Sequence, residues 1–329
     1  MNKRLLGKTE FEVSEIGLGT WQLGGKWGQD FNHNNADKIL NLAIDNGVNF
    51  IDTADVYNDG DSEKAIGRLI KSRSERIYVA TKCGRQLSPH NDKAYQTTAL
   101  RKFVEDSLMR MGLETLDLIQ LHCPPTETYD RPEIFDLFDT LKKEGKILNL
   151  GVSVEKIDEA KKAITYSNVT TVQIIFNMLR QRPANDFFAL AAKNNVGIIA
   201  RVPLASGLLT GKFSPSTQFN KNDHRSFNRN GEMFDKGETF SGVDYNNGLK
   251  AVKEIKELFP KDVDLVKIAL RWILMFKEVS CVIPGASSPA QAIANTMASA
   301  QPNLTLEQID GIKRIYEDNI WPDIANEKW

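Results

Sequence analysis

The sequence predicts an α/β protein of the (β/α)8 TIM-barrel class, with an N-terminal β-hairpin and a long loop after the seventh strand. Eight short apolar segments alternate with longer helical patterns along the 329 residues. Continuously apolar strands separated by helices are typical of a parallel sheet that is covered on its outer face. A doubly wound sheet would need a glycine-rich phosphate turn after the first strand, but Gly17, Gly19 and Gly24 do not fit G-x-G-x-x-G.

The eight predicted strands follow a short hairpin-like start, and each is a compact apolar run. In chain order they are EIGLGT, NFID, IYVATK, LDLIQLH, ILNLGVS, TVQIIFN, VGIIARV and SCVIPG. The segments between them, such as NADKILNLAIDNG and TTALRKFVEDSLMRMG, carry apolar residues three and four positions apart. They end at Gly or Asn, which indicates amphipathic helices with ordinary stop signals.

One connection breaks this rhythm, between the seventh strand and its helix. Residues 205–245 are rich in Gly, Asn, Ser and Phe. Compact domains rarely keep so long a loop unless it is a lid or is disordered, and the phenylalanines favour a lid. With 41% hydrophobic residues the chain can bury a large core, and we expect one domain over residues 1–329.

The composition excludes several classes of protein. Basic and acidic residues balance at 42 and 43 with no basic run, so we expect no nucleic-acid partner. No apolar run approaches the ~20 residues that span a membrane, and the N-terminal segment lacks a signal-peptide core. Three widely spaced cysteines fit reduced thiols in a cytoplasmic protein. His33, His90 and His224 lack metal-ligand spacing, so we expect no metal site.

Polar side chains close three successive predicted strands. Asp52, Lys82 and His122 end the second, third and fourth strands, at intervals of 30 and 40 residues. One barrel unit averages about 31 residues, so the three are in phase with the repeat. The active site of such a barrel lies at the carboxyl ends of its strands, and Tyr57 follows the second strand closely enough to reach it.

A phenol, an ammonium, a carboxylate and an imidazole together make a proton-transfer centre. Free tyrosine has a pKa of ~10, and we expect Lys82, oriented by Asp52, to bring Tyr57 closer to neutrality. His122 can direct a substrate oxygen, and a carbonyl under reduction is the natural substrate for the Tyr57 acid. Singly, each residue could be a helix cap, a solvated charge or a buried ring, so the prediction depends on their shared phase.

Two other functions stay open on the same residues. Lys82 could act as the Schiff-base nucleophile of a barrel aldolase, provided that it is neutral in an apolar setting. Alternatively, the chain could be a nicotinamide-cofactor-binding regulatory or sensor subunit with little turnover.

Several motifs, read together, resemble the aldo-keto reductase family. They run in family order across nearly the whole chain: GLGTW (17–21), DTADVYNDGDSEKAIG (52–67), VATK (79–82), LDLIQLH (116–122), GKILNLGVS (145–153), PLASGLLTGKF (203–213) and VIPGASSPAQAIAN (282–295). The resemblance implies a (β/α)8 reductase that acts on a small-molecule carbonyl substrate with NADP(H), without metal or bound flavin; a departure from the family pattern leaves NAD(H) open as a second cofactor. Its oligomeric state is left unknown.

The resemblance also implies roles for individual residues. Asp52, Tyr57, Lys82 and His122 look like the catalytic tetrad, with Tyr57 as the general acid. The positions that resemble cofactor contacts are Gly19, Thr20, Trp21, Ser153, Gln173, Arg201, Leu204, Ser206, Leu208, Gly211, Lys212, Gly285, Ser287, Gln291 and Asn295.

Three of these positions depart from the family pattern. Val154 follows Ser153 where the family usually has Asn, and Arg201 stands where an aromatic ring commonly lies under the nicotinamide. A flat guanidinium can also stack. The segment after Pro284 offers Ser287, Ser288 and Gln291 but no cation for a 2′-phosphate, so we expect only a modest preference for NADPH over NADH.

Other prominent residues have mostly structural interpretations. Strand alternation predicts that Cys83 and Cys123 turn into the barrel wall. Trp21, Trp27 and Phe31 follow the first strand and are expected to shape a substrate pocket. The C-terminal segment NIWPDIANEKW either closes over that pocket or packs outside the barrel.

Overall fold

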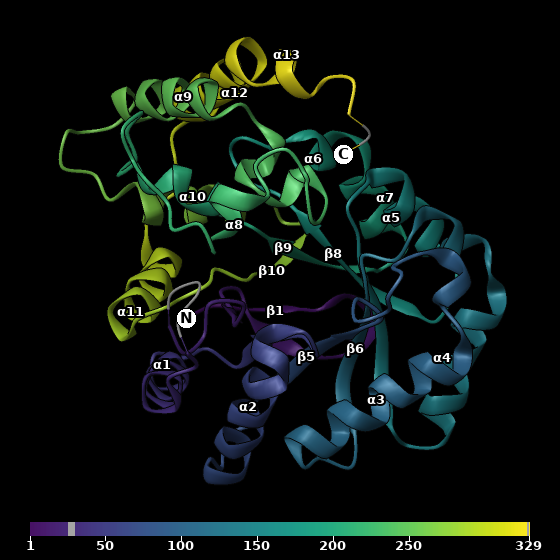
Figure 1. Ribbon diagram of the computed structural model, residues 1–329. Helices are drawn as coiled ribbons and strands as arrows, with labels where there is room; N and C mark the ends of the chain where they lie inside the picture. The colour runs from purple at the N-terminus through teal and green to yellow at the C-terminus, as the bar shows by residue number, and fades with distance from the viewer. Residues whose placement is uncertain (26–29, 328) are drawn as a thin grey trace.

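The computed structural model describes residues 1–25, 30–327 and 329, and it contains the predicted barrel (Figure 1). All neighbouring strands of its eight-stranded sheet are parallel and lie in chain order. Single parallel bridges from Ile16 to Val282 and from Gly19 to Gly285 join the first and last strands. The strands are β3 (Leu18–Gly19), β4 (Phe50–Asp52), β5 (Tyr78–Cys83), β6 (Leu116–His122), β7 (Ile147–Ser153), β8 (Val169–Ile175), β9 (Gly197–Arg201) and β10 (Val279–Val282).

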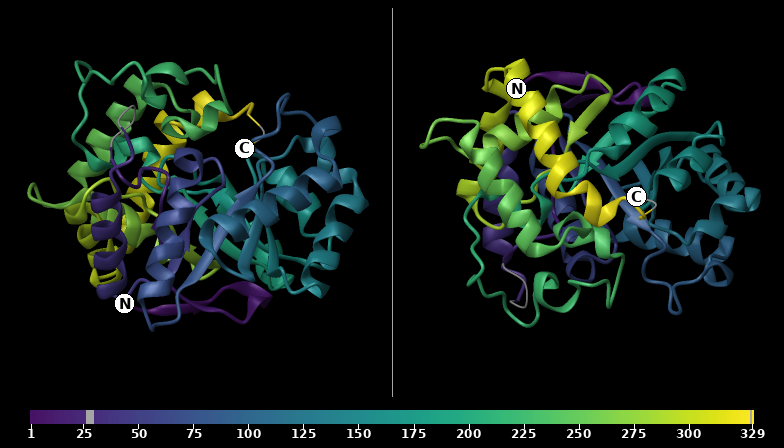
Figure 2. Two further views of the ribbon diagram at one scale, coloured as in Figure 1. Left: turned by 60° about the horizontal axis from the view of Figure 1, so that its bottom comes forward. Right: turned by 90° about the horizontal axis from the view of Figure 1, so that it is seen from above.

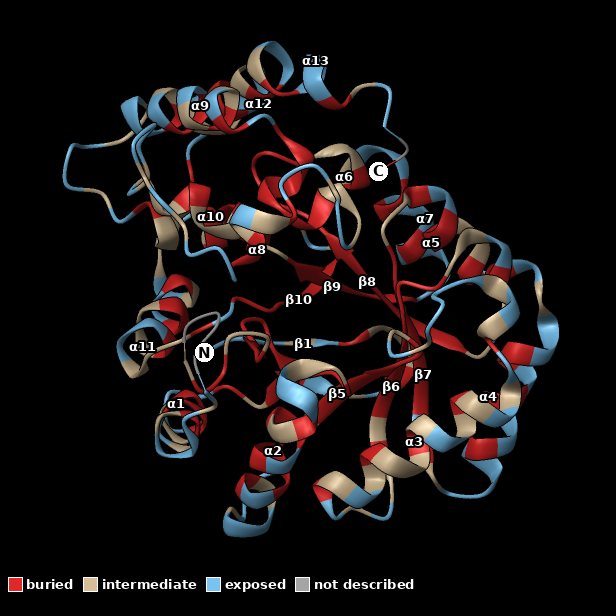
Figure 3. Ribbon diagram, in the orientation of Figure 1, coloured by how far each residue is buried: buried red, intermediate tan, exposed pale blue. Residues whose placement is uncertain are grey.

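Helices surround the sheet, with their buried faces toward it and their exposed faces outward (Figure 3). Their ends follow the local sequence: the Asn32 side chain accepts from the Asn35 amide at the start of one helix, and Gly112 ends another in the left-handed conformation. The helices are α1 (His33–Asp45), α2 (Asp61–Ser72), α3 (Thr97–Met111), α4 (Pro132–Lys143), α5 (Ile157–Ala163), α6 (Arg182–Asp186), α7 (Phe188–Lys193), α8 (His224–Phe227), α9 (Tyr245–Glu257), α10 (Leu265–Leu274), α11 (Pro289–Thr296), α12 (Leu306–Asn319) and α13 (Trp321–Ile324).

The predicted N-terminal hairpin is present and packs against the amino-terminal end of the barrel (Figure 2). Its strands β1 (Lys3–Leu5) and β2 (Glu12–Ser14) pair antiparallel. Leu6 and Val13 join the interior cluster that contains Phe50 and Leu118. This arrangement leaves the opposite end of the barrel, where the strands finish, as the mouth.

Strand periodicity explains why the polar strand ends face the barrel interior. Residues two apart on a strand share a face. Phe50, Ala80 and Leu118 lie in the interior cluster, and Asp52, Lys82 and Gln120 each follow one of them by two residues. The register aligns Lys82 with Gln120 and His122 with Ser153, which gathers the polar groups at one level of the barrel.

Residues 205–245, which we call the lid segment, are folded rather than disordered. They contain α8 and three 3-10 turns, at Ala205–Thr210, Lys236–Glu238 and Phe240–Gly242. The phenylalanines pack on one another, since Phe219 lies 5.2 Å from Phe213 and 5.8 Å from Phe240 between ring centroids. The segment is therefore ordered, and its action as a lid stays a prediction.

The C-terminal tryptophan packs onto this lid segment. Trp329 is buried, and its Nε1 donates to Asp235 Oδ2 at 3.3 Å. The guanidinium carbon of Arg180 lies 4.3 Å from the centroid of the Trp329 ring. A Cβ added to Gly242 would come within 2.2 Å of the same ring, so Gly242 allows the close approach. Trp329 therefore packs against the lid segment at Asp235 and Gly242.

None of the described helices is both long and apolar enough to cross a membrane.

Candidate active site

A buried ion pair lies at the centre of the mouth. Lys82 Nζ donates to Asp52 Oδ1 at 2.6 Å and to the Thr53 carbonyl oxygen at 2.7 Å. Both charged side chains are almost completely buried. Burial acts to lower the pKa of Lys82, but Asp52 and Tyr57 outweigh it and the pKa is raised. Lys82 is therefore a fixed ammonium.

Tyr57 brings its phenol oxygen to this ammonium. Lys82 Nζ donates to Tyr57 Oη at 3.3 Å. The tyrosine begins a tight turn in which Asn58, Asp59 and Gly60 all have positive φ, at 50°, 52° and 87°. Two of these are not glycine, so the turn holds the phenol in place at a cost in backbone strain.

The pKa of Tyr57 is raised, which corrects our expectation. Loss of solvation is the largest cause, and Asp52 adds to it, while the Lys82 ammonium acts in the opposite direction. We expected the ammonium to prevail and bring the phenol toward neutrality. The phenol instead stays protonated, which suits a general acid and requires Lys82 to stabilise any phenolate that forms.

His122 completes the group as a neutral imidazole. Its ring centroid lies 6.1 Å from that of Tyr57, with the planes at 84°. Burial, followed by Arg85 and Lys82, holds the pKa of His122 well below its ordinary value. Its Nδ1 is buried and has no hydrogen-bond partner within the described chain. A neutral ring can direct an oxygen by hydrogen bonding without competing for the proton.

Two glutamines hold the far oxygen of Asp52. Gln173 Nε2 donates to Asp52 Oδ2 at 2.7 Å and Gln120 Nε2 at 3.2 Å. Gln120 was not among the predicted site residues, although it lies two residues before His122 on the same face of β6. The Gln173 amide is thus hydrogen-bonded to the Asp52 carboxylate.

The strand-one positions lie where the barrel closes. Gly19 pairs with Gly285, and a Cβ on Gly19 would come within 2.9 Å of the Ile283 carbonyl oxygen. The Thr20 hydroxyl donates to the Asp52 carbonyl oxygen at 2.9 Å, so it braces β4. The ring of Trp21 is at the mouth, with its centroid 6.4 Å from that of Tyr57.

Side chains from the next strands surround the same space. Ser153 and Gln173 are paired in register and buried, and Arg201 ends β9 with 8% of its surface exposed. The turn after β9 then runs through three successive left-handed residues, Ala205, Ser206 and Gly207.

The remaining predicted positions of this turn differ in their accessibility. Leu208 is fully buried, so its side chain belongs to the core. Leu204 is half-buried, and Gly211 ends the turn in the left-handed conformation. Lys212 is exposed beyond it.

The positions after Pro284 form one hydrogen-bonded unit. Gln291 Oε1 accepts from the Ser287 amide at 2.8 Å and from the Ser287 hydroxyl at 3.0 Å. Asn295 Nδ2 donates to the Gly285 carbonyl oxygen at 3.2 Å. No Arg or Lys occurs in the sequence from Gly285 to Asn295, so the modest preference for NADPH stays a prediction.

These residues fit a nicotinamide dinucleotide. Ser153 pairs in register with His122, the Arg201 guanidinium donates to Cys123 Sγ, and Arg201 Nε is buried without a hydrogen-bond partner among the described residues. Hydroxyls and main-chain amides at Ser206 and Ser287 are of the kind that bind phosphates.

A second group of side chains, which we call the rim charge cluster, consists of the charged residues Arg85, Glu155, Arg201 and Glu238 and the thiol of Cys123. Of its charged residues, sequence reasoning had singled out Arg201 alone. Glu238 comes from the lid segment, and its Oε1 lies 3.3 Å from Arg85 Nη1 and 3.3 Å from Arg201 Nη1. Arg85 Nη1 lies 3.5 Å from Glu155 Oε1. Only the position of Arg85, two residues after Cys83 at the end of β5, could have signalled this cluster in the sequence.

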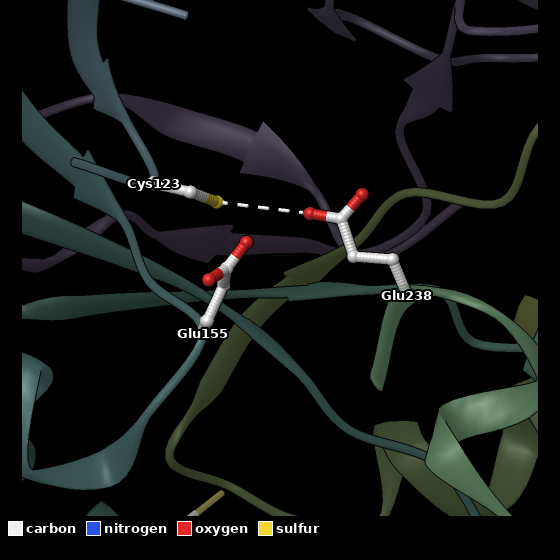
Figure 4. Close-up of side chains that lie close together, drawn as sticks. All are labelled: Cys123, Glu155 and Glu238. Atoms are coloured by element: carbon white, nitrogen blue, oxygen red, sulfur yellow. Dashed lines mark hydrogen bonds between the residues drawn. The ribbon is translucent and has the colours of Figure 1, made fainter. Parts of the chain in front are cut away.

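Three members of the cluster approach one another closely enough to hold a cation. Ligand atoms of Cys123, Glu155 and Glu238 all lie within 4.8 Å of one another (Figure 4). The guanidiniums of Arg85 and Arg201, however, already occupy this carboxylate cluster. Burial also raises the pKa of the Cys123 thiol to about 12, which disfavours the thiolate that a metal would need. The geometry therefore favours an ion-pair cluster.

Cys123 also corrects a prediction. It was expected to turn into the wall, yet its Sγ lies 3.6 Å from the Ser153 hydroxyl oxygen and 3.6 Å from Arg201 Nη2. The strand ends at His122 and the Cys123 backbone has φ 48°, so strand alternation no longer governs its direction. Cys83 is buried in the wall, as predicted.

Aromatic rings line the lid side of the mouth. The ring centroid of Trp21 lies 4.9 Å from that of His224 and 6.2 Å from that of Phe234. His224 is a buried residue of the lid segment, and the sequence had suggested only a polar loop there. Phe31 packs on the core, and Trp27 lies outside the described residues.

Comparison with known proteins agrees with this geometry. The sequence pattern described as the Aldo/keto reductase family matches residues 15–317. An uncharacterized oxidoreductase of Bacillus subtilis (strain 168) is 30% identical over 324 residues, which cover 98% of each chain. An NADH-specific methylglyoxal reductase of Escherichia coli (strain K12) is 28% identical over 330 residues, which cover 94% of this chain and 96% of the relative.

Solved structures give the same result. An aldo-keto reductase from Bacillus halodurans in its holo form superposes with a TM-score of 0.77 at 28% identity over 96% of both chains. The glycerol dehydrogenase from Gluconobacter oxydans has a TM-score of 0.77 at 29% identity, over 97% of this chain and 96% of its own. The chain described above is a member of the aldo/keto reductase family, whose members reduce carbonyls with nicotinamide cofactors.

Proposed function

We propose that this protein reversibly reduces an aldehyde or ketone, with Tyr57 as the general acid and Asp52, Lys82 and His122 as its partners. The bound reduced nicotinamide would supply the hydride. The substrate oxygen would lie against the Tyr57 hydroxyl and the His122 ring, the two groups that meet at the mouth. As the carbonyl carbon is reduced, its oxygen gains negative charge and takes the proton of Tyr57.

The ion pair beneath Tyr57 serves the phenolate that remains. The Lys82 ammonium stays charged because Asp52 lies 2.6 Å away, and it is already 3.3 Å from the phenol oxygen. In alcohol oxidation the same phenolate would accept the proton. The observation that carries this proposal is the convergence of Lys82, Asp52 and Tyr57 within hydrogen-bonding distance in a buried mouth.

The most direct test is Tyr57→Phe, which removes the acidic proton and keeps the ring. General acid catalysis contributes ~10²–10⁴ in rate, so kcat for carbonyl reduction is expected to fall by at least that order. Cofactor binding, followed by the fluorescence of reduced nicotinamide, is expected to persist. Near-normal turnover by the variant would remove Tyr57 from the mechanism.

The aldolase alternative conflicts with the electrostatics of Lys82. A Schiff-base nucleophile must be neutral, whereas the pKa of Lys82 is raised by Asp52 and Tyr57 against the effect of burial. Borohydride trapping with a carbonyl substrate is accordingly expected to leave Lys82 unmodified.

We also propose that NADPH is preferred only modestly over NADH. The adenosine end offers the Ser287 hydroxyl and the Gln291 amide, which bind a 2′-phosphate less strongly than a cation does. An NADH-specific enzyme among the relatives is consistent with such a site. Competitive titration is expected to give a preference below a hundredfold, and a larger one would point to a cation such as Lys212.

We also infer that the chain is a single-domain, cytoplasmic enzyme. One continuous hydrophobic cluster contains residues from Ile16 to Trp329, which supports a single domain over residues 1–329. The three cysteines are free and buried, as suits a cytoplasmic enzyme. A screen of aldehydes, ketones and sugar alcohols with both cofactors would identify the substrate class.

A further inference from the structure

Arg201 places a fixed positive charge beside the catalytic group. Its Nη2 donates to the Val154 carbonyl oxygen at 3.0 Å and to Cys123 Sγ at 3.6 Å. Its Nη1 lies 3.3 Å from Glu238 Oε1. The guanidinium is therefore held on several sides and is nearly excluded from water. A charge in such a setting acts strongly on its neighbours because solvent does not screen it.

The lid segment supplies the carboxylate that offsets this charge. Glu238 is the one carboxylate within ion-pairing distance of Arg201 in the part of the chain that the structure describes. The other glutamate of the cluster, Glu155, pairs with Arg85 instead. Lid residues also anchor Glu238, since its carbonyl oxygen accepts from the Ser206 hydroxyl at 3.2 Å. The charge balance at Arg201 therefore depends on the position of the lid segment.

The protonation states of Glu155 and Glu238 make the charge balance at Arg201 depend mainly on Glu238. Burial raises the pKa of Glu155 to about 8, and Glu238 and Asp235 add to the effect. The pKa of Glu238 is shifted in the opposite direction. Burial acts to raise it, but Arg85 and Arg201 outweigh this effect, so the pKa is lowered. Near pH 7 the two guanidiniums thus share mainly one carboxylate charge, that of Glu238.

We propose that Glu238 sets the balance between oxidised and reduced cofactor on this protein by offsetting the charge of Arg201. The inference rests on the proposed function, because it needs the nicotinamide ring to lie against Arg201. An oxidised nicotinamide ring carries a positive charge that the reduced ring lacks. An uncompensated guanidinium would repel the oxidised form selectively, and the Glu238 carboxylate removes that bias.

This arrangement couples the lid segment to the direction of the reaction. With the lid segment away from the mouth, Arg201 favours the reduced cofactor. With Glu238 in place, the positive charge that develops as hydride leaves the ring is tolerated. Glu238 thus acts as a positioning residue that works through Arg201.

The test measures binding rather than turnover. The dissociation constants of NADPH and NADP⁺ are determined by calorimetry for the wild type, for Glu238→Gln and for Glu232→Gln. Glu232 is an exposed glutamate of the same lid segment that bonds to Asn230, so it is a matched control. We expect Glu238→Gln to weaken NADP⁺ relative to NADPH by about tenfold or more, and Glu232→Gln to leave the ratio unchanged.

A second variant guards against a merely structural effect. In the double variant Arg201→Met, Glu238→Gln both charges are gone, so the ratio of the two dissociation constants is expected to return toward that of the wild type. Glu238→Asp is expected to restore part of the ratio. Equal weakening of both cofactors by Glu238→Gln, or a ratio in the double variant as distorted as in the single one, would overturn the inference. A wild type that binds neither cofactor would instead overturn the proposed function.

Discussion

The two charged groups at the mouth are built in different ways. The relay of Asp52, Lys82 and Tyr57 lies on adjacent strands of the barrel and the turn that follows, with its central ion pair at 2.6 Å. The rim charge cluster joins the end of β9 and the segments that follow β5, β6 and β7 to the lid segment, with Glu238 at 3.3 Å from each of two guanidiniums.

The two groups therefore depend on different parts of the fold: the relay depends on the barrel, and the rim charge cluster depends on the lid segment as well. Sheet hydrogen bonds set the positions of Asp52 and Lys82, and the tight turn after β4 sets that of Tyr57. The rim charge cluster exists only while a long connection stays folded against the mouth. The relay is therefore suited to a proton transfer that needs a fixed geometry, and the rim charge cluster is suited to adjusting the affinity for the cofactor.

The largest effect is expected from breaking the relay at Lys82→Met. The variant leaves Asp52 buried without its cation, which typically costs 3–5 kcal/mol of stability, and it removes the stabilisation of the phenolate. We expect kcat to fall at least ~10²-fold and the free energy of unfolding, measured in urea, to fall as well. Lys64→Met, which breaks an exposed pair with Asp61, is the control and is expected to change stability by less than ~1 kcal/mol.

Adding Asp52→Asn to Lys82→Met separates the two consequences. Stability is expected to recover in part because no unpaired charge remains, whereas activity is expected to stay low. Recovery of activity in the double variant would contradict the role of Lys82.

A second prediction concerns Asp55, a buried residue beside the relay. Neither carboxylate oxygen has a hydrogen-bond partner within the described chain, and burial, with Glu63 adding to it, raises the pKa to about 7. Because the pKa of Asp55 is higher in the folded protein than in the unfolded chain, protonated Asp55 contributes to stability. This contribution is fully present below the unfolded pKa near 4 and is lost as the pH rises through about 7. Ionisation then costs a few kcal/mol, since one pKa unit is worth about 1.4 kcal/mol.

Asp55→Asn is therefore expected to stabilise the protein more at pH 8 than at pH 4. Thermal unfolding at both values measures the difference, and Asp59→Asn, at an exposed position nearby, is the control. An equal change in melting temperature at both pH values would mean that Asp55 has a partner that keeps it ionised.

A smaller and more local effect is expected at the lid segment from Trp329→Ala. The variant removes the ring from Arg180 and the hydrogen bond to Asp235, and the loss of these two contacts is expected to cost about 1–3 kcal/mol of lid stability. Hydrogen exchange over residues 235–242 should accelerate while β5 and β6 keep their protection. Trp321→Ala, at a more exposed tryptophan, is the control. Uniform loss of protection would show that Trp329 supports the whole barrel.

The sequence predicted the parts of the site that depend on local pattern. Asp52, Lys82 and His122 were found because each ends an apolar strand, and the barrel converts that regularity into proximity. Arg85 and Glu238 could not be paired in this way, since 153 residues separate them and only the fold of the lid segment brings them together. The direction of the pKa shift of Tyr57 was also predicted wrongly, because the shift depends on loss of solvation, and the burial that causes it cannot be read from the sequence.

The turn that carries Tyr57 also has a consequence for laboratory evolution. Asn58 and Asp59 occupy backbone conformations that glycine adopts without penalty. A library of variants selected only for heat tolerance is expected to enrich glycine at these two positions. The selected variants would have a more flexible turn and would hold the Tyr57 phenol less rigidly. Substitutions at these two exposed residues should therefore raise thermal stability and lower the rate of catalysis together.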